Sequence, residues 1–364
     1  MMQQQPSTKA FIEALQSSLW NREINQAPFE NLDRNQWIAI FKLSFHQTVE
    51  GMICQAIQKL PKELLPPADL MLKWLVRLER IEQKNQLMDT IIAEQATIFQ
   101  QNGIEAILQK GHGVSLYYAH PSIRLSGDID WYFPKKEQYH QANQLMEKLG
   151  QDFKIHPAYS SGYHFKEIEI EHHQKLVQLR NPFVLKKIKK IYQQQEKYNR
   201  LHTIGGVQVT IPSPMLNILQ VDAHILKHQI TYGIGLRQLC DSARLYHSLS
   251  NDIDPIALKD IYTKLGMLKW SYVFHQVLVN LLGLDQNKLP YLADKALKSD
   301  WMADYILRTG NFGFYDQDHP DINNPGGRVD RSTRLFGNFK NFITLAPVET
   351  ICFPVVHLFS KIHH

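Results

Sequence analysis

The sequence predicts a mixed α/β (α+β) core flanked by an N-terminal and a C-terminal helical region. Three observations lead to this fold class. Apolar residues recur every three or four positions up to about residue 101, strand-like alternation and glycine turns dominate from 103 to 211, and helical spacing then returns. The length of 364 residues allows two or three structural units, and we expect them at residues 1–100, 101–211 and 212–364.

The composition is that of an ordinary globular protein. Hydrophobic residues make up 44% and charged residues 21%, which excludes a fibrous or wholly disordered chain. Forty basic and 35 acidic residues give a net charge of +5, which permits phosphate ligands but is far below that of a dedicated nucleic-acid-binding domain. The three cysteines are too scattered for a disulfide framework or a cysteine-based zinc site, so we expect a cytoplasmic protein.

No targeting segment or membrane span is expected. The first residues lack the basic and apolar regions of a secretory signal. The nearest approach to a span, residues 342–359, contains Glu349 and His357 and is interrupted by Pro347 and Pro354. Because a span needs about 20 apolar residues, we predict a soluble protein.

The N-terminal region is predicted to be helical throughout. Phe11, Leu15 and Leu19 are four residues apart, and comparable spacing occurs at residues 37–41 and 72–81. Three prolines between residues 60 and 68 should separate these helices into two groups.

The central region begins at Gly103. Residues 104–108 are predicted to form a strand, followed by a glycine-containing turn at residues 110–113, an arrangement that is typical of anion sites. The later elements expected are a short helix at 114–118, a strand at 127–133, a helix at 135–149, paired strands within 155–177, a basic segment at 185–200 and a strand at 207–211.

The C-terminal region should begin with Ser213 as a helix N-cap and Pro214 at the first helical position. Residues 310–334 are rich in Gly, Asn, Asp and Pro and are predicted to form a long loop, of a length that is often functional. The predicted helices span residues 215–229, 235–248, 254–265, 271–282 and 291–308.

Two aspartates carry the main chemical signal. On a strand, Asp128 and Asp130 project from the same face, with Cα atoms about 6.6 Å apart at a rise of about 3.3 Å per residue. Adjacent carboxylates repel each other unless a positive charge lies between them, and Mg²⁺ prefers oxygen ligands. The pair therefore predicts a divalent-cation site, with solvated acids at a strand edge as the alternative.

A third carboxylate is expected on a neighbouring strand. Glu169 and Glu171 alternate so that both occupy one strand face, and either could complete a metal site. We prefer Glu171, which is followed by two histidines, while a solvated strand face is the alternative.

These residues also support a family resemblance. Lys110-Gly111 followed by R-x-x-G-D-I-D-W-Y at residues 124–132 resembles the nucleotidyltransferase superfamily with the polymerase-beta-like fold. It is similar in particular to a bacterial group with the motif L-K-G … Y-P … R-x-x-G-D-I-D. The resemblance covers about residues 85–315, and segments 224–241 and 310–313 look like the helical C-terminal portion of that group.

The resemblance implies roles for the acids and for the nucleotide. Asp128 and Asp130 would ligate Mg²⁺ (or Mn²⁺) that bridges the phosphates of an NTP, and the third acid would activate or orient the acceptor hydroxyl. The superfamily usually has Gly-Ser before its first helix, whereas this chain has Lys110-Gly111. The implied nucleotide-binding residues are Lys110, Gly111, Gly113, Arg124, Ser126, Gly127, Arg237 and Asp241.

Other candidates have simpler explanations. Arg237 and Asp241 are four residues apart on a predicted helix, so a structural ion pair is as plausible as a role facing the nucleotide. His224 and His228 are expected to pack or to hydrogen-bond substrate, and no zinc is predicted. Lysines within residues 186–190 are expected to form a solvated helix face, with RNA binding as the alternative.

We therefore predict metal-dependent transfer of a nucleoside monophosphate from an NTP to an acceptor, with release of pyrophosphate. A small molecule, a sugar phosphate or a protein hydroxyl is preferred over tRNA as the acceptor. The first alternative is a toxin-like tRNA nucleotidyltransferase, because R-x-S-x-D-I-D after a K-G turn also resembles the abortive-infection enzymes. The second is a non-catalytic nucleotide-binding or scaffold protein with the same fold.

Overall fold

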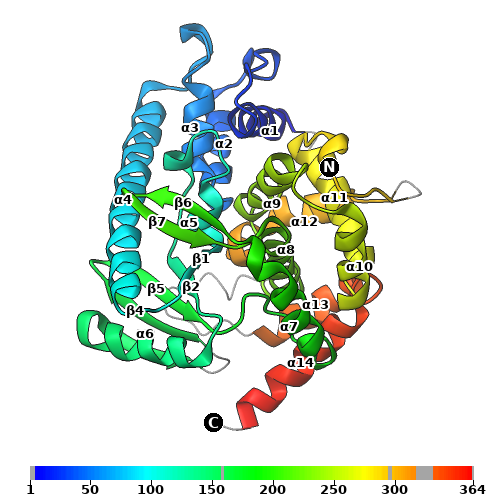
Figure 1. Ribbon diagram of the computed structural model, residues 1–364. Coiled ribbons are helices and arrows are strands. Elements are labelled where there is room, and N and C mark those ends of the chain that lie inside the picture. The colour runs from blue at the N-terminus through cyan, green and yellow to red at the C-terminus, as the bar shows by residue number, and fades with distance from the viewer. Residues whose placement is uncertain (1–4, 157–159, 294–296, 317–330, 363–364) are drawn as a thin grey trace.

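The computed structural model describes residues 5–156, 160–293, 297–316 and 331–362 (Figure 1). A mixed sheet and one long helix make up one side of the molecule, and most of the remaining helices pack on the other side. The predicted α+β class is therefore confirmed.

The N-terminal region is helical, as predicted. Pro67 is the N-cap of the 34-residue helix α4, and the proline-rich segment before it separates this helix from the first three. Phe99 and Met88 on α4 belong to the apolar cluster that covers one sheet face, which explains why the helix lies along the sheet in Figure 1. The four helices are α1 (Pro6–Leu19), α2 (Arg34–His46), α3 (Glu50–Ile57) and α4 (Ala68–Gln101).

The sheet contains seven strands in the order β3-β4-β5-β2-β1-β7-β6. It is mixed because β2 pairs parallel with β5 and β1 pairs parallel with β7, while the other neighbours are antiparallel. The strands are β1 (Ile107–Gln109), β2 (Ile129–Tyr132), β3 (Gln151–His156), β4 (Ser160–Phe165), β5 (Ile168–His173), β6 (Arg200–Ile204) and β7 (Val207–Ile211).

Two predictions around the first strand need correction. The strand begins at Ile107 and not at residue 104, because the Ile104 N–H donates to the Phe99 carbonyl and completes the end of α4. The helix expected at 114–118 is α5 (Lys110–Ser115), which follows β1 directly. Gly111, with a φ of 26°, permits this abrupt change of direction.

A strand was also missed within the segment expected to be only basic and helical. Residues 185–200 contain α7 (Leu185–Gln195), but Arg200 begins the edge strand β6, which pairs with β7. The helix predicted at 135–149 is confirmed as α6 (Lys136–Leu149).

The C-terminal region is helical, and the Ser213 side chain accepts from the Leu216 N–H as the predicted N-cap of α8. The helix expected from residue 291 begins only at Asp300, and the Tyr291 carbonyl accepts a hydrogen bond from His275. The helices are α8 (Pro214–Thr231), α9 (Leu236–Leu249), α10 (Pro255–Leu265), α11 (Leu268–Leu282), α12 (Asp300–Thr309), α13 (Arg331–Phe342) and α14 (Pro347–Ile362).

The predicted loop 310–334 is only partly described, because residues 317–330 lie outside the described chain. The loop prediction is wrong for residues 331–334, which form the first turn of α13. The helices of the two ends share one apolar core that includes Phe11 of α1, Leu219 of α8 and Trp270 of α11. A second core lies between α4, α6 and the sheet.

Candidate active site

A polar cavity of about 320 Å³ lies where strands β2 and β5 meet the helices α5, α8 and α9. Its volume is at the lower end of the range of small-ligand sites, about 300–1,000 Å³. Both acidic and basic side chains contribute to the walls: Asp128, Asp130, Glu171, Lys110, Lys227 and Arg237.

Strand alternation in β2 places Asp130 in this cavity. Ile129 and Trp131 are fully buried in the core beneath α4, so the side chain between them faces the opposite side of the sheet. Asp128 lies one residue before the strand, and it also lines the cavity. The two aspartates are thus brought together as predicted, although only Asp130 belongs to β2.

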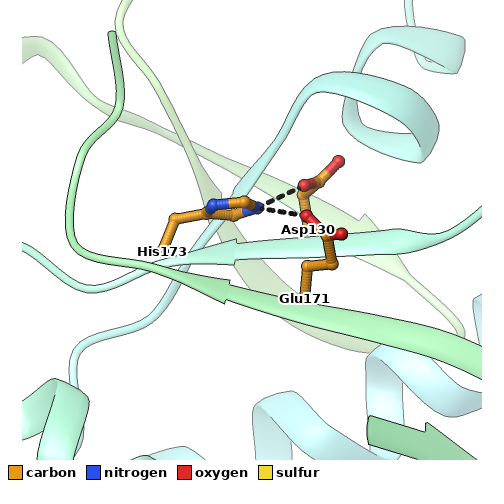
Figure 2. Close-up of side chains that lie close together, drawn as sticks. All are labelled: Asp130, Glu171 and His173. Atoms are coloured by element: carbon orange, nitrogen blue, oxygen red, sulfur yellow. Dashed lines mark hydrogen bonds and ion pairs between the residues drawn. The ribbon is translucent and has the colours of Figure 1, made fainter. Parts of the chain in front are cut away.

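Strand β5 repeats this pattern next to β2. Ile170 is fully buried, whereas Glu171 and His173 line the cavity. The parallel register pairs Asp130 directly with Glu171, as Figure 2 shows. Glu169 is exposed and lies outside the cavity walls, which agrees with the preference for Glu171.

His173 connects the two strand acids. Its Nε2 atom lies 2.6 Å from Asp130 Oδ1 and 3.1 Å from Glu171 Oε2 (Figure 2). Behind the ring, Lys227 Nζ donates to Gln178 Oε1 at 2.8 Å, and the Gln178 amide nitrogen lies 3.3 Å from His173 Nδ1.

The direction of this hydrogen-bond chain is fixed by lysine, which can only donate. Gln178 therefore points its oxygen at Lys227 and donates its N–H to His173 Nδ1. The proton of a neutral His173 then resides on Nε2 and is shared with the two carboxylates. His173 thus positions the acids.

The carboxylates differ in their affinity for protons. Burial, together with Asp130 and Glu171 nearby, raises the pKa of Asp128 to about 6. Burial alone would also raise the pKa of Asp130, but Lys110 and His173 hold it at about 2. The hydrogen bond from His173 lowers the pKa of Glu171 against the opposing effect of burial. At neutral pH the cavity therefore holds three negative charges.

This donor set suits a hard divalent cation. Asp130, Glu171 and His173 each place one potential ligand atom within 4.8 Å of the others. Because the His173 Nε2 proton faces the acids, the available ligands are carboxylate oxygens, and Asp128 supplies another at the same cavity. Oxygen ligands are those that Mg²⁺ prefers.

Only some residues of the glycine-containing turn at 110–113 line the cavity. Lys110 Nζ lies 3.3 Å from Asp130 Oδ1, and its side chain is only 12% exposed. Gly111 also lines the cavity, whereas Gly113 is buried, where an added Cβ would press against Leu108, and lies outside the cavity walls.

Arg124 and Asp241 form a buried ion pair in place of the possible pair between Arg237 and Asp241. The Arg124 Nε and Nη2 atoms each lie 2.6 Å from an Asp241 oxygen. Arg124 Nη1 donates to Ser126 Oγ at 3.0 Å, and the Tyr118 hydroxyl donates to Asp241 at 2.7 Å. The pair borders the cavity, but Ser126 does not line it.

Arg237 is more available to a ligand than Arg124, whose guanidinium is hydrogen-bonded to Asp241. It lines the cavity and donates to the Leu125 carbonyl, while its buried Nε has no partner among the described residues. Burial and the neighbouring Arg124 lower the pKa of Arg237, and Asp241 and Asp128 oppose this effect. Nearby, Lys84 Nζ donates to the carbonyl of Gly127, which also lines the cavity.

His224 and His228 lie one turn apart on α8, with ring centroids 4.3 Å apart, and both line the cavity. The buried Nδ1 atom of each ring has no partner among the described residues. Burial lowers the pKa of both rings well below the usual value, so they are neutral at physiological pH. Neither belongs to the one potential metal group found among the described residues.

Sequence reasoning missed His173, Gln178, Lys227 and Lys84. His173 could have been found, because period-two alternation puts it on the same strand face as Glu171. Lys84 and Lys227 come from helices far from the motif and carry no local signal. The four lysines within residues 186–190 are exposed on α7, outside the cavity walls, as expected of a solvated face.

A comparison with protein families identifies a nucleotidyltransferase family. A family model described as "Uncharacterised nucleotidyltransferase" matches residues 33–283, a region that contains every predicted site residue. No curated protein matches the chain. A solved structure, that of an antigenic nucleotidyltransferase-like protein from Paracoccidioides brasiliensis, is 13% identical with a TM-score of 0.34, over 54% of this chain and 92% of that chain.

None of the helices in the described part of the chain combines the length and the apolarity that crossing a bilayer requires.

Proposed function

This chain belongs to the family of uncharacterised nucleotidyltransferases, and from that membership we propose that it transfers a nucleoside monophosphate from an NTP to an acceptor. The observation that carries the proposal is the convergence of Asp128, Asp130 and Glu171 on one cavity that also contains Arg237 and Lys227, which form no salt bridge within the described residues. Three close carboxylates beside phosphate-binding cations suit metal-dependent phosphoryl chemistry.

In the proposed reaction, an acceptor oxygen attacks the α-phosphorus of the NTP. The new phosphorus–oxygen bond replaces the bond to the β-phosphate, pyrophosphate leaves, and Glu171 takes up the hydroxyl proton. Neutralisation of the phosphate charge is the chemistry that Mg²⁺ or Mn²⁺ supplies when bound by Asp128 and Asp130. His173 holds Asp130 and Glu171 in place through its Nε2–H.

Phosphate binding is proposed for Lys110, Arg237 and the backbone around Gly111, which line the cavity. Arg124 and Asp241 are proposed to hold α9 against the segment before β2, since they satisfy each other. In this way they position Arg237, which lies one turn before Asp241 on α9.

A small-molecule, sugar-phosphate or protein acceptor is preferred, because the cavity is small. A tRNA acceptor is the second candidate, and the exposed lysines of α7 are the observation that favours it. Both candidates share the same catalytic residues and differ only in the surface that the acceptor would contact.

The experiment is a transfer assay with each NTP, Mg²⁺ or Mn²⁺, and a panel of hexose phosphates, sugar acids, hydroxyl-bearing peptides and bulk tRNA. Product masses and released pyrophosphate are measured. Asp130→Asn should abolish transfer, whereas Glu169→Gln, which changes an exposed acid on β5 outside the cavity, should retain it. Metal-dependent NTP binding without any transfer would instead support the non-catalytic alternative.

A further inference from the structure

Lys227 is a buried cation that the fold leaves without a matching anion. Its Nζ atom donates to Gln178 Oε1, and it makes no salt bridge with any residue of the described ranges. The carboxylate of Glu349 is near, but its two oxygens accept from the backbone N–H groups of Arg180 and Asn181. A buried ammonium without a counter-ion is costly, so its retention points to an anionic ligand.

Two cations of the cavity have different acidic neighbours. Arg237 interacts electrostatically with Asp128, the acid that precedes β2. Lys227 interacts instead with Glu171 and is connected through Gln178 to His173 on β5. Lys110 interacts with both groups, since it acts electrostatically on Asp128, Glu171 and Lys227. An anion beside Glu171 can therefore contact Lys227, and an anion beside Asp128 can contact Arg237.

Neutral hydrogen-bonding groups flank Lys227 on the same helix. His224 precedes it by one turn and His228 follows it, and both rings line the cavity with a buried, unpartnered Nδ1. A neutral imidazole can donate or accept, which makes it a suitable partner for a hydroxyl group. Because buried polar atoms are normally hydrogen-bonded, the two orphan nitrogens indicate a missing polar ligand.

We infer that Lys227, His224 and His228 form the acceptor subsite, and that the acceptor is a small hydroxyl compound bearing a phosphate or carboxylate group. The inference rests on the proposed function, in which Glu171 receives the proton of the acceptor hydroxyl. Lys227 would bind the anionic group, and the histidines would contact further hydroxyls. The nucleotide phosphates would bind beside Asp128 and Arg237.

The test measures binding to the full-length protein by calorimetry with Mn²⁺ and a non-hydrolysable NTP analogue. Neutral polyols, their phosphorylated forms and the corresponding sugar acids are then titrated into the loaded protein. We expect the anionic compounds to bind at least tenfold more tightly than the neutral ones. The comparison of phosphorylated compounds with sugar acids then identifies which anionic group the acceptor bears. Equal binding of neutral and anionic compounds by the wild type would overturn the inference without any variant.

Lys227→Met should weaken binding of the anionic compound about ten- to hundredfold more than it weakens binding of the NTP analogue, whose own loss reports the effect of the broken Lys227–Gln178 hydrogen bond on the metal-binding acids. Lys186→Met, a change in an exposed lysine of α7, is the matched control and should alter neither. Equal losses for the analogue and the acceptor in Lys227→Met would place Lys227 in the triphosphate site and refute the inference. Failure of the proposed function is distinguishable, because the wild type would then show no metal-dependent binding of the analogue, or would bind the analogue but yield no transfer product with any acceptor.

Discussion

Replacement of Arg124 by methionine separates a structural role from a nucleotide-binding role. Arg124 is 2% exposed and Asp241 is 6% exposed, and two hydrogen bonds of 2.6 Å join them. In Arg124→Met, the Asp241 carboxylate would stay buried with only the Tyr118 hydroxyl as a side-chain partner. Removing one member of such a pair costs about 3–5 kcal/mol in the free energy of unfolding.

The free energy of unfolding is measured by urea denaturation with fluorescence detection. NTP binding is measured separately by calorimetry in the absence of urea. The double variant Arg124→Met with Asp241→Leu should regain most of the lost stability, because it leaves no unpaired buried charge. NTP affinity should change less than twofold in the folded double variant. A loss of stability below about 1 kcal/mol, combined with a tenfold loss of NTP affinity in Arg124→Met, would refute the structural role.

Three other perturbations concern the titrating acids and the exposed lysines. Because the pKa of Asp128 is about 6, Mn²⁺ affinity measured by calorimetry should rise between pH 5 and 7 and level off above that, and Asp128→Asn should flatten the profile. Burial raises the pKa of Asp222 to about 6, so the protonated acid favours the folded state. The contribution of Asp222 to the free energy of unfolding should be greatest below pH 4 and should fall by about 2–3 kcal/mol as the pH rises through 6. Asp222→Asn should remove this pH dependence in thermal melts. Bulk tRNA should bind no more tightly than about 10⁻⁴–10⁻⁶ M at physiological salt, and sub-micromolar binding that is lost when Lys186, Lys187, Lys189 and Lys190 become glutamine would favour the tRNA acceptor.

The strand acids were predictable because alternation is a local property. Apolar Ile129 and Trp131 bracket Asp130, and this pattern alone indicates which face is buried. Alternation placed both Glu169 and Glu171 on one strand face, and Glu171 was preferred because two histidines follow it. The parallel register of β2 and β5 pairs Glu171 with Asp130. The fold class was predictable for a similar reason, since helical and strand-like periodicities occupy separate parts of the chain.

Long-range partners could not be predicted. The four-residue spacing suggested Arg237 as the partner of Asp241, but packing of α9 brings in Arg124 from 117 residues away. The edge strand β6 was missed because its two apolar residues lie on opposite faces, with Leu201 exposed and Ile204 buried, so the sequence shows no apolar alternation. The division of the chain into three structural units, with boundaries at residues 101 and 212, stays a prediction.

The hydrogen-bond chain from Lys227 to His173 has a consequence for assembly of the protein. Lys227 comes from α8, beyond the expected end of the central unit at residue 211, whereas the acids come from within it. The isolated segment 101–211 would contain all three carboxylates but not the donor that fixes the tautomer of His173. A cation that binds the completed site would therefore strengthen the docking of α8. At a concentration one hundred times its dissociation constant it would add about 2.7 kcal/mol, which makes thermal stability a direct report of metal binding.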